Sequence, residues 1–138
     1  MKAEKGSQLI VHAPDQPGEL AKVMKLVSDF GINIRAYAGW VSEGTGRIIL
    51  ITEDNTKALS LISDAGFEAR EEEVALVTDR DVIGSGSKIV QKIAETGINL
   101  ESVFASTNGD GDYLTVFQTS DVDRLISALT ESESGQRE

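Results

Sequence analysis

The side chains that most often carry out catalysis are scarce in this sequence. It contains no cysteine, which excludes thiolate nucleophiles, disulfides and cysteine-bound metals. Its single histidine, His12, excludes a site with several histidine ligands within one chain. No Ser-His-Asp set and no HxxxH pattern is present, and catalysis needs a nucleophile–base pair or a metal cluster. We therefore expect a protein without catalytic activity, metal or cofactor.

The polar residues with the most informative spacing form a turn, residues 15–20 (Asp-Gln-Pro-Gly-Glu-Leu), before an amphipathic helix predicted over 17–30. Pro17 suits the first helical position, because its missing N–H would be unpaired there in any case. Asp15 lies close enough to accept hydrogen bonds from the N–H groups of the first turn. The turn therefore marks the start of a helix.

The elements around this turn follow the order β-α-β-β-α-β. Continuous or alternating apolar runs mark the strands, and apolar residues at helical spacing mark the helices. We predict strands at 8–13, 33–41, 47–52 and 67–73, and helices at 17–30 and 55–65. This order predicts an α+β fold, with a four-stranded antiparallel sheet of the ferredoxin-like type and helices on one face.

The second half of the chain repeats the first at a shift of 66 residues. Gly18 matches Gly84, and the sequence Gly-Ile-Asn-Ile that starts at Gly31 matches Gly-Ile-Asn-Leu at Gly97. The predicted strands of the repeat are 74–78, 99–107 and 113–119. We therefore divide the chain into two ferredoxin-like units, residues 1–73 and residues 74–130.

The repeat lacks a clear last strand. Residues 131–138 are polar, and we expect them to form a disordered tail. The second unit would then have about three strands and an uncovered sheet edge, which is a reason to expect a homodimer.

The charge of the chain limits its partners. The net charge is −10 over 138 residues, so phosphate backbones and anionic lipid surfaces are repelled. No apolar run approaches membrane-spanning length, and the first eight residues lack an apolar signal segment. We expect a cytoplasmic protein that binds neither nucleic acid nor membranes.

The turn, the helix and the Gly-Ile-Asn-Ile segment in a β-α-β-β-α-β unit together resemble the ACT domain. ACT domains are small regulatory modules that bind amino acids beside many enzymes of amino-acid metabolism. The resemblance covers nearly the whole chain, as two ACT-like units without an attached enzyme. It implies a non-catalytic sensor of an amino acid that acts by allosteric regulation.

In that family the ligand usually lies where two units meet, between the turn after one first strand and the start of a second strand. The resemblance implies these ligand-binding residues: Asp15, Gln16, Pro17, Gly18, Glu19, Leu20, Asn33 and Ile34 in the first unit, and Asp81, Ile83, Gly84, Ser85, Asn99 and Leu100 in the second. Helix-start N–H groups would hold the α-carboxylate, and Asp15 or an Asn amide oxygen the α-ammonium group.

Other interpretations of the same residues stay open. The turn is a good helix start in any protein, Asn33 could merely anchor its strand, and a structural role suits His12 better than a ligand role. The alternative function is a detached regulatory subunit that binds a biosynthetic enzyme and has weak or no ligand affinity of its own.

Overall fold

The computed structural model describes residues 1–107 and 109–137, with side chains described as far as residue 130. Its strands are β1 (Lys2–Pro14), β2 (Ile34–Ser42), β3 (Thr45–Thr52), β4 (Glu68–Arg80), β5 (Ser102–Thr107) and β6 (Asp112–Gln118). Its helices are α1 (Glu19–Asp29), α2 (Asn55–Asp64), α3 (Ser85–Glu95) and α4 (Val122–Arg137). The tail predicted to be disordered, residues 131–138, lies outside the residues described in full and stays a prediction.

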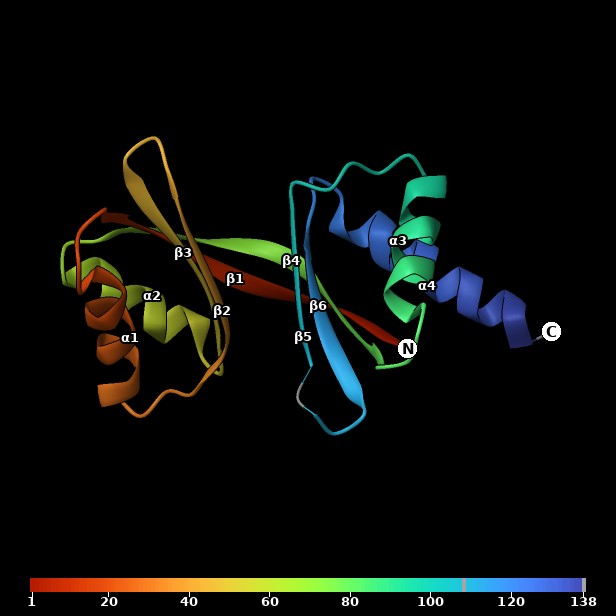
Figure 1. The fold of residues 1–138 in the computed structure, drawn as a ribbon, viewed down its shortest axis with the longest axis horizontal. Helices are drawn as coiled ribbons and strands as arrows, with labels where there is room; N and C mark the ends of the chain where they lie inside the picture. Colours follow the sequence, from red (N-terminus) through yellow and green to blue (C-terminus); the bar gives the residue numbers. More distant parts are fainter. Residues whose placement is uncertain (108, 138) are drawn as a thin grey trace. The chain divides into compact units, whose positions relative to one another are not determined.

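The chain forms two compact units. Ser7–Glu72 makes up the first unit, and Met1–Gly6 together with Glu73–Glu138 makes up the second unit. The strand order is β2-β3-β1-β4 in the first unit and β1-β4-β6-β5 in the second. In Figure 1 the first unit carries α1 and α2, and the second carries α3 and α4. The predicted fold class is confirmed, because the first unit has the order β-α-β-β-α-β and the second repeats it as β-α-β-β-α.

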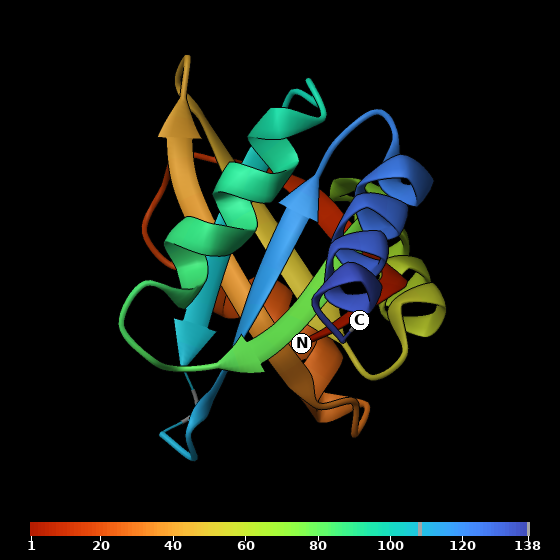
Figure 2. The same ribbon diagram turned by 90° about the vertical axis from the view of Figure 1, so that its right-hand side faces the viewer.

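Helices cover one face of the sheet in each unit, as predicted. In the first unit the core lies between α1, α2 and the strands, and its fully buried members are Leu9, Val11, Val23, Val27, Leu50, Ala58 and Ile62. In the second unit α3 and α4 pack on Ala75, Val77 and Phe117, and Figure 2 shows both helices on the same side of β4 and β6. The apolar stripes read from the sequence are therefore the buried helix faces.

The N-terminal residues were missed as a strand. We predicted a first strand at 8–13, whereas β1 begins at Lys2. No strand follows α4 in the described part of the chain, as expected, but Met1–Gly6 supplies the fourth strand of the second unit beside β4. We had placed residues 1–73 in the first unit, but Met1–Gly6 belongs with the second unit, which otherwise begins at Glu73.

Charged and apolar contacts join this N-terminal segment to the second unit. The Lys5 ammonium group lies 2.7 Å from an Asp123 carboxylate oxygen and 3.3 Å from one of Glu73. Hydrogen bonds to Asp123, and then to Glu73, raise the pKa of Lys5 above its usual value. Ala3 also packs against the core of the second unit. A short charged segment of this kind has no apolar pattern that would predict a strand. Its pairing partner, β4, lies about seventy residues away in sequence, so local pattern does not reveal the pairing either.

Candidate ligand-binding site

The turn before α1 ends in a glycine with a left-handed backbone. Gly18 is the N-cap at φ 89°, and α1 begins at Glu19. The prediction that Pro17 opens the helix is therefore wrong, because Pro17 precedes the N-cap. Among the described residues no side-chain hydrogen bond caps α1, so the capping role suggested for Asp15 is not seen there. Gly84 takes the same conformation before α3, at φ 88°, and only glycine adopts it without strain.

This geometry leaves backbone donors open at the start of α1. The first bond inside the helix runs from the Lys22 N–H to the Gly18 carbonyl, at 3.0 Å. The N–H groups of Leu20 and Ala21 come earlier, and no acceptor for them is found in the part of the chain that the structure describes. The start of α1 can therefore donate to a carboxylate.

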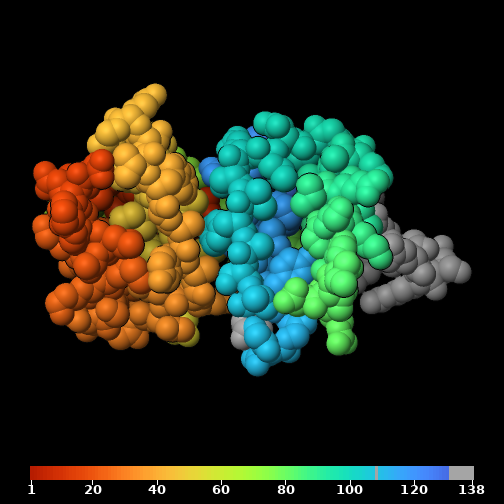
Figure 3. Space-filling model, in the orientation of Figure 1, coloured from red at the N-terminus to blue at the C-terminus, as the bar shows by residue number. Residues whose placement is uncertain are grey.

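A pocket of about 510 Å³ lies next to these donors, within the first unit. It is lined by residues 13–16, 19, 20, 37–41 and 46–48, from the turn, α1, β2 and β3. Four of the predicted site residues line it: Asp15, Gln16, Glu19 and Leu20. Its volume falls within the range of small-molecule sites. In Figure 3 the β2–β3 hairpin, in yellow and orange, projects beside the red segment that contains the turn.

The pocket combines apolar walls with one buried acid. Leu20, Tyr37 and Val41 are 41%, 56% and 57% exposed, which is unusual for apolar side chains of this size. Glu19 is only 9% exposed, and its carboxylate lies 3.2 Å from the Lys22 ammonium group. A ligand with an ammonium group and an apolar body would find partners for both.

Two glycines make room for the pocket. Gly39 pairs with Ile48, whose side chain belongs to the core beneath the helices, so position 39 faces the same side. Gly46 pairs with Val41 on one side and with the core residue Ala13 on the other. Neither glycine carries a side chain, so the floor of the pocket is backbone. We did not predict this pair, because it becomes visible only once the strand register is known.

The other predicted residues of the first unit lie elsewhere. The Asn33 carbonyl accepts a hydrogen bond from the Glu53 N–H at 3.0 Å, at the far end of β3 from Gly46. Seven residues separate Gly46 from Glu53, which is roughly 23 Å along a strand. Asn33 and Ile34 do not line the pocket, and neither do Pro17 and Gly18. Within this unit one amino acid cannot touch both the turn and Asn33.

The second unit separates its predicted residues in the same way. The Asp81 N–H donates to the Gly111 carbonyl at one end, and the Asn99 carbonyl accepts from the Thr119 hydroxyl at the other. The Ser85 hydroxyl donates to the carbonyls of Arg80 and Val82, both at 2.9 Å. A hollow of about 320 Å³ is lined by Ile83 and Ser85, but not by Asp81, Gly84, Asn99 or Leu100.

Tyr113 is partly buried in the second unit, near the start of α3. It packs against the core, and its hydroxyl oxygen lies 3.6 Å from the position of a Cβ placed on Gly86. That hydroxyl is buried, and no hydrogen-bond partner for it is found in the described part of the chain. A buried polar atom without a partner lowers stability.

Removing this hydroxyl is therefore expected to stabilise the protein. Tyr113→Phe should raise the free energy of unfolding by about 1 kcal/mol, measured by urea denaturation. Tyr37→Phe is the matched control, since Tyr37 is exposed and the change should be close to zero. A loss of stability in Tyr113→Phe would show that the hydroxyl has a partner.

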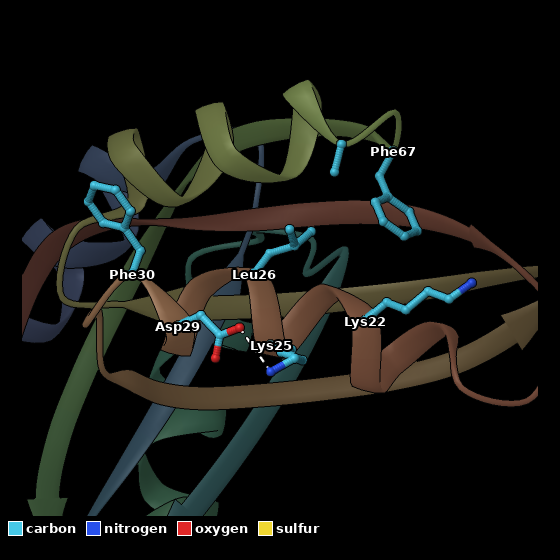
Figure 4. A pocket seen from close by; sticks show the side chains of 7 residues that line it. Lys22, Lys25, Leu26, Asp29, Phe30 and Phe67 are labelled. Carbon is cyan, nitrogen blue, oxygen red and sulfur yellow. Dashed lines mark ion pairs between the residues drawn. The ribbon is translucent and has the colours of Figure 1, made fainter.

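A second groove, of about 560 Å³, lies on the helical surface of the first unit. Figure 4 shows Phe67 and the α1 residue Leu26 facing the same space, with Phe30 at the other end. Its lysines are engaged: Lys25 pairs with Asp29 at 2.9 Å, and Lys22 with Glu19. No predicted ligand-binding residue lines this groove.

Two further features bear on the kind of site. No group of three or more histidine, aspartate or glutamate side chains suited to a metal ion occurs among the described residues. Within the same part of the chain, every helix is too short or too polar to cross a membrane. His12 lies on its strand with its Nε2 3.1 Å from an Arg70 guanidinium nitrogen and does not line the pocket.

Residues 7–65 match the ACT domain, and no curated protein matches the sequence. Protein BT0572 from Bacteroides thetaiotaomicron has a similar structure, with a TM-score of 0.87 and 22% identity over 95% of this chain and 90% of that one.

Two regulatory subunits of aspartate kinase are also similar in structure. The subunit from Thermus thermophilus has a TM-score of 0.69 and 18% identity, over 94% of this chain and 95% of that one. The subunit from Thermus flavus has a TM-score of 0.64 and 20% identity, over 95% and 96%. At these identities the likeness concerns the fold, whereas the match to residues 7–65 concerns the sequence itself. The first unit therefore carries an ACT domain, in residues 7–65.

Proposed function

We propose that this protein is a non-catalytic, cytoplasmic regulatory module that binds an amino acid at the start of α1. The observation that carries the proposal is the pocket of about 510 Å³ inside the ACT domain, which places open N–H donors, a buried acid and apolar walls together. An amino acid has the matching groups, namely a carboxylate, an ammonium group and a side chain.

Each group of the ligand has a partner in this arrangement. The N–H groups of Leu20 and Ala21 would receive the α-carboxylate, with support from the dipole of α1. The carboxylates of Asp15 and Glu19 would receive the α-ammonium group. The side chain would lie on Tyr37 and neighbouring apolar atoms. Pro17 and Gly18 would fix the shape of the turn without touching the ligand.

Regulation would come from a second unit or a second copy of the chain. Asn33 with Ile34, and Asn99 with Leu100, lie at the ends of their units opposite to the turns, so their amides would reach a ligand only from another unit. We propose a homodimer for this reason. A ligand that binds such a junction shifts the equilibrium between packing arrangements by its difference in affinity for them.

Ligand binding can be tested with the full chain and the twenty amino acids. An amino acid at a hundred times its dissociation constant is expected to add about 2.7 kcal/mol of stability, seen as a rise of several degrees in the unfolding temperature. Trp40 is the single tryptophan and lines the pocket, so its fluorescence should change with the same ligand.

A charge-removing variant locates the site. Glu19→Gln should weaken binding about tenfold, because it removes a buried charge from the pocket. Glu43→Gln, in the exposed hairpin turn, is the matched control and should bind as the wild type does. The proposal fails if no amino acid at millimolar concentration changes either the unfolding temperature or the fluorescence.

A second candidate function is a regulatory subunit that acts by binding an enzyme of amino-acid metabolism. The groove between α1 and α2 favours it, since Phe30 is 55% exposed there beside Leu26 and Phe67. The structural relatives that are regulatory subunits of aspartate kinase make that enzyme the first to test. Phe30→Ser should abolish a change in enzyme activity that needs no amino acid, whereas Val90→Ser, on α3, should not.

A further inference from the structure

The two units differ at the positions that form the floor of the pocket. Gly39 pairs with Ile48 across β2 and β3, and Ala105 pairs with Thr115 at the corresponding place across β5 and β6. Gly46 pairs with Val41, and Tyr113 pairs with Thr107 at the corresponding place. The second unit therefore has a methyl group and a phenol where the first unit has two glycines.

The tyrosine in the second unit spans from the sheet to the helix. The hydroxyl oxygen of Tyr113 lies against Gly86, which is the second residue of α3. The second residue of α1 is Leu20, and Leu20 and Gly46 both line the open pocket of the first unit. The volume that a tyrosine ring fills in the second unit is thus the volume that stands open in the first.

We propose that the pocket of the first unit binds an amino acid with an aromatic side chain, while the second unit is filled by its own Tyr113 and binds none. This inference rests on the proposed function and specifies the ligand class. The ring of the ligand takes the place of the Tyr113 ring, over the backbone of Gly39 and Gly46. Its α-carboxylate and α-ammonium group meet the start of α1 and the Asp15 and Glu19 carboxylates.

The size and polarity of the pocket favour an aromatic ring over other side chains. A ligand with a small side chain would leave most of the 510 Å³ pocket unfilled. It would then lose the dispersion contacts that a larger side chain makes with the pocket walls. Leu20, Tyr37 and Val41 add apolar walls, which suit an aromatic ring better than a polar side chain. With the α-groups at the start of α1, the far edge of the ring meets the backbone of Gly39 and Gly46.

Gly39 offers a variant that fills the pocket without straining the fold. Its φ is not positive, and a Cβ placed on it meets nothing nearer than the Arg47 carbonyl oxygen, at 3.5 Å. Gly39→Val should fold and weaken L-phenylalanine binding at least tenfold. Ala105→Val is the matched control at the corresponding position of the second unit, and its affinity should equal that of the wild type.

Calorimetry of the full chain with L-phenylalanine, L-tyrosine and the other amino acids tests the inference. We expect one phenylalanine per chain and a loss of binding in Gly39→Val alone. Unchanged phenylalanine binding by a folded Gly39→Val variant would overturn the assignment. Selective binding of a small amino acid would overturn it as well and leave the proposed function standing, whereas binding of no amino acid would remove both.

Tyr113→Ala tests the claim that the second unit is filled from within. Truncating the ring should open a second pocket and add a second phenylalanine per chain, bound more weakly than the first because Ser85 stands where the first unit has Glu19. A folded Tyr113→Ala variant that still binds one would overturn this part of the inference. If this variant does not fold, the comparison of Gly39→Val with Ala105→Val still decides the site in the first unit.

Discussion

A chain that lacks Met1–Gly6 is expected to lose the folded structure of its second unit and keep that of its first. The deletion removes the fourth strand beside β4, the contact of Ala3 with the core and the ion pairs of Lys5. The remaining second unit would have three strands and an uncovered edge, and units of this size are marginal even when complete. We expect a loss of about 2 kcal/mol or more, or outright unfolding of this unit.

Hydrogen exchange resolves the two units and is the measurement of choice. Amides of β5 and β6 should lose protection in the deleted chain, while those of β3 keep it. Lys5→Ala is the control, because it removes only the exposed ion pairs. The protection of its amides should be close to that of the wild type. Equal protection of β5 and β6 with and without residues 1–6 would contradict the strand assignment.

Phe117→Ala is expected to be the most damaging single substitution in the second unit. Phe117 is fully buried on β6, where it pairs with Ala75 on β4 and with Val103 on β5 and packs beneath α3 and α4. Truncation removes the transfer free energy of the ring and leaves a cavity, a combined cost of about 3–5 kcal/mol.

Urea denaturation of Phe117→Ala, read by circular dichroism, measures this cost. Phe30→Ala is the matched control, because the same atoms are removed from a side chain that is 55% exposed. Its cost should stay below about 1 kcal/mol. Similar midpoints for the two variants would show that the core of the second unit does not depend on Phe117.

Most of the fold could be predicted from apolar patterns within short stretches of sequence. The predicted and observed elements differ where pairing depends on residues that are far apart in sequence. The 66-residue repeat and the apolar periodicity of α1 gave the element order, because both signals lie within short windows. The strand formed by residues 2–6 has no such signal, and its partner β4 is remote in sequence. Gly18 is the N-cap of α1 and has a positive φ. A rule that places proline at the first helical position does not predict such a start.

The candidate site shows the same limit. Asp15 and Glu19 were found because the turn is continuous in sequence, whereas Gly39 and Gly46 form one floor only through the pairing of β2 with β3. The repeat did contain one signal that could have pointed to the pocket, namely Tyr113. Matching β3 to β6 at a shift of 67 residues places it opposite Gly46, and a glycine matched to a large ring predicts a space that one unit fills and the other leaves open.

The division of β1 between the units sets an order of assembly. Its first residues are synthesised before the first unit, while the β4 segment that pairs with them follows the whole of that unit. The first unit can close as soon as residue 72 is available, but the second must await the return of a strand made much earlier. Contacts of such long sequence separation form slowly. The N-terminal strand therefore pairs with β4 late in folding. Refolding should show a fast phase for the first unit and a slower phase for the second unit.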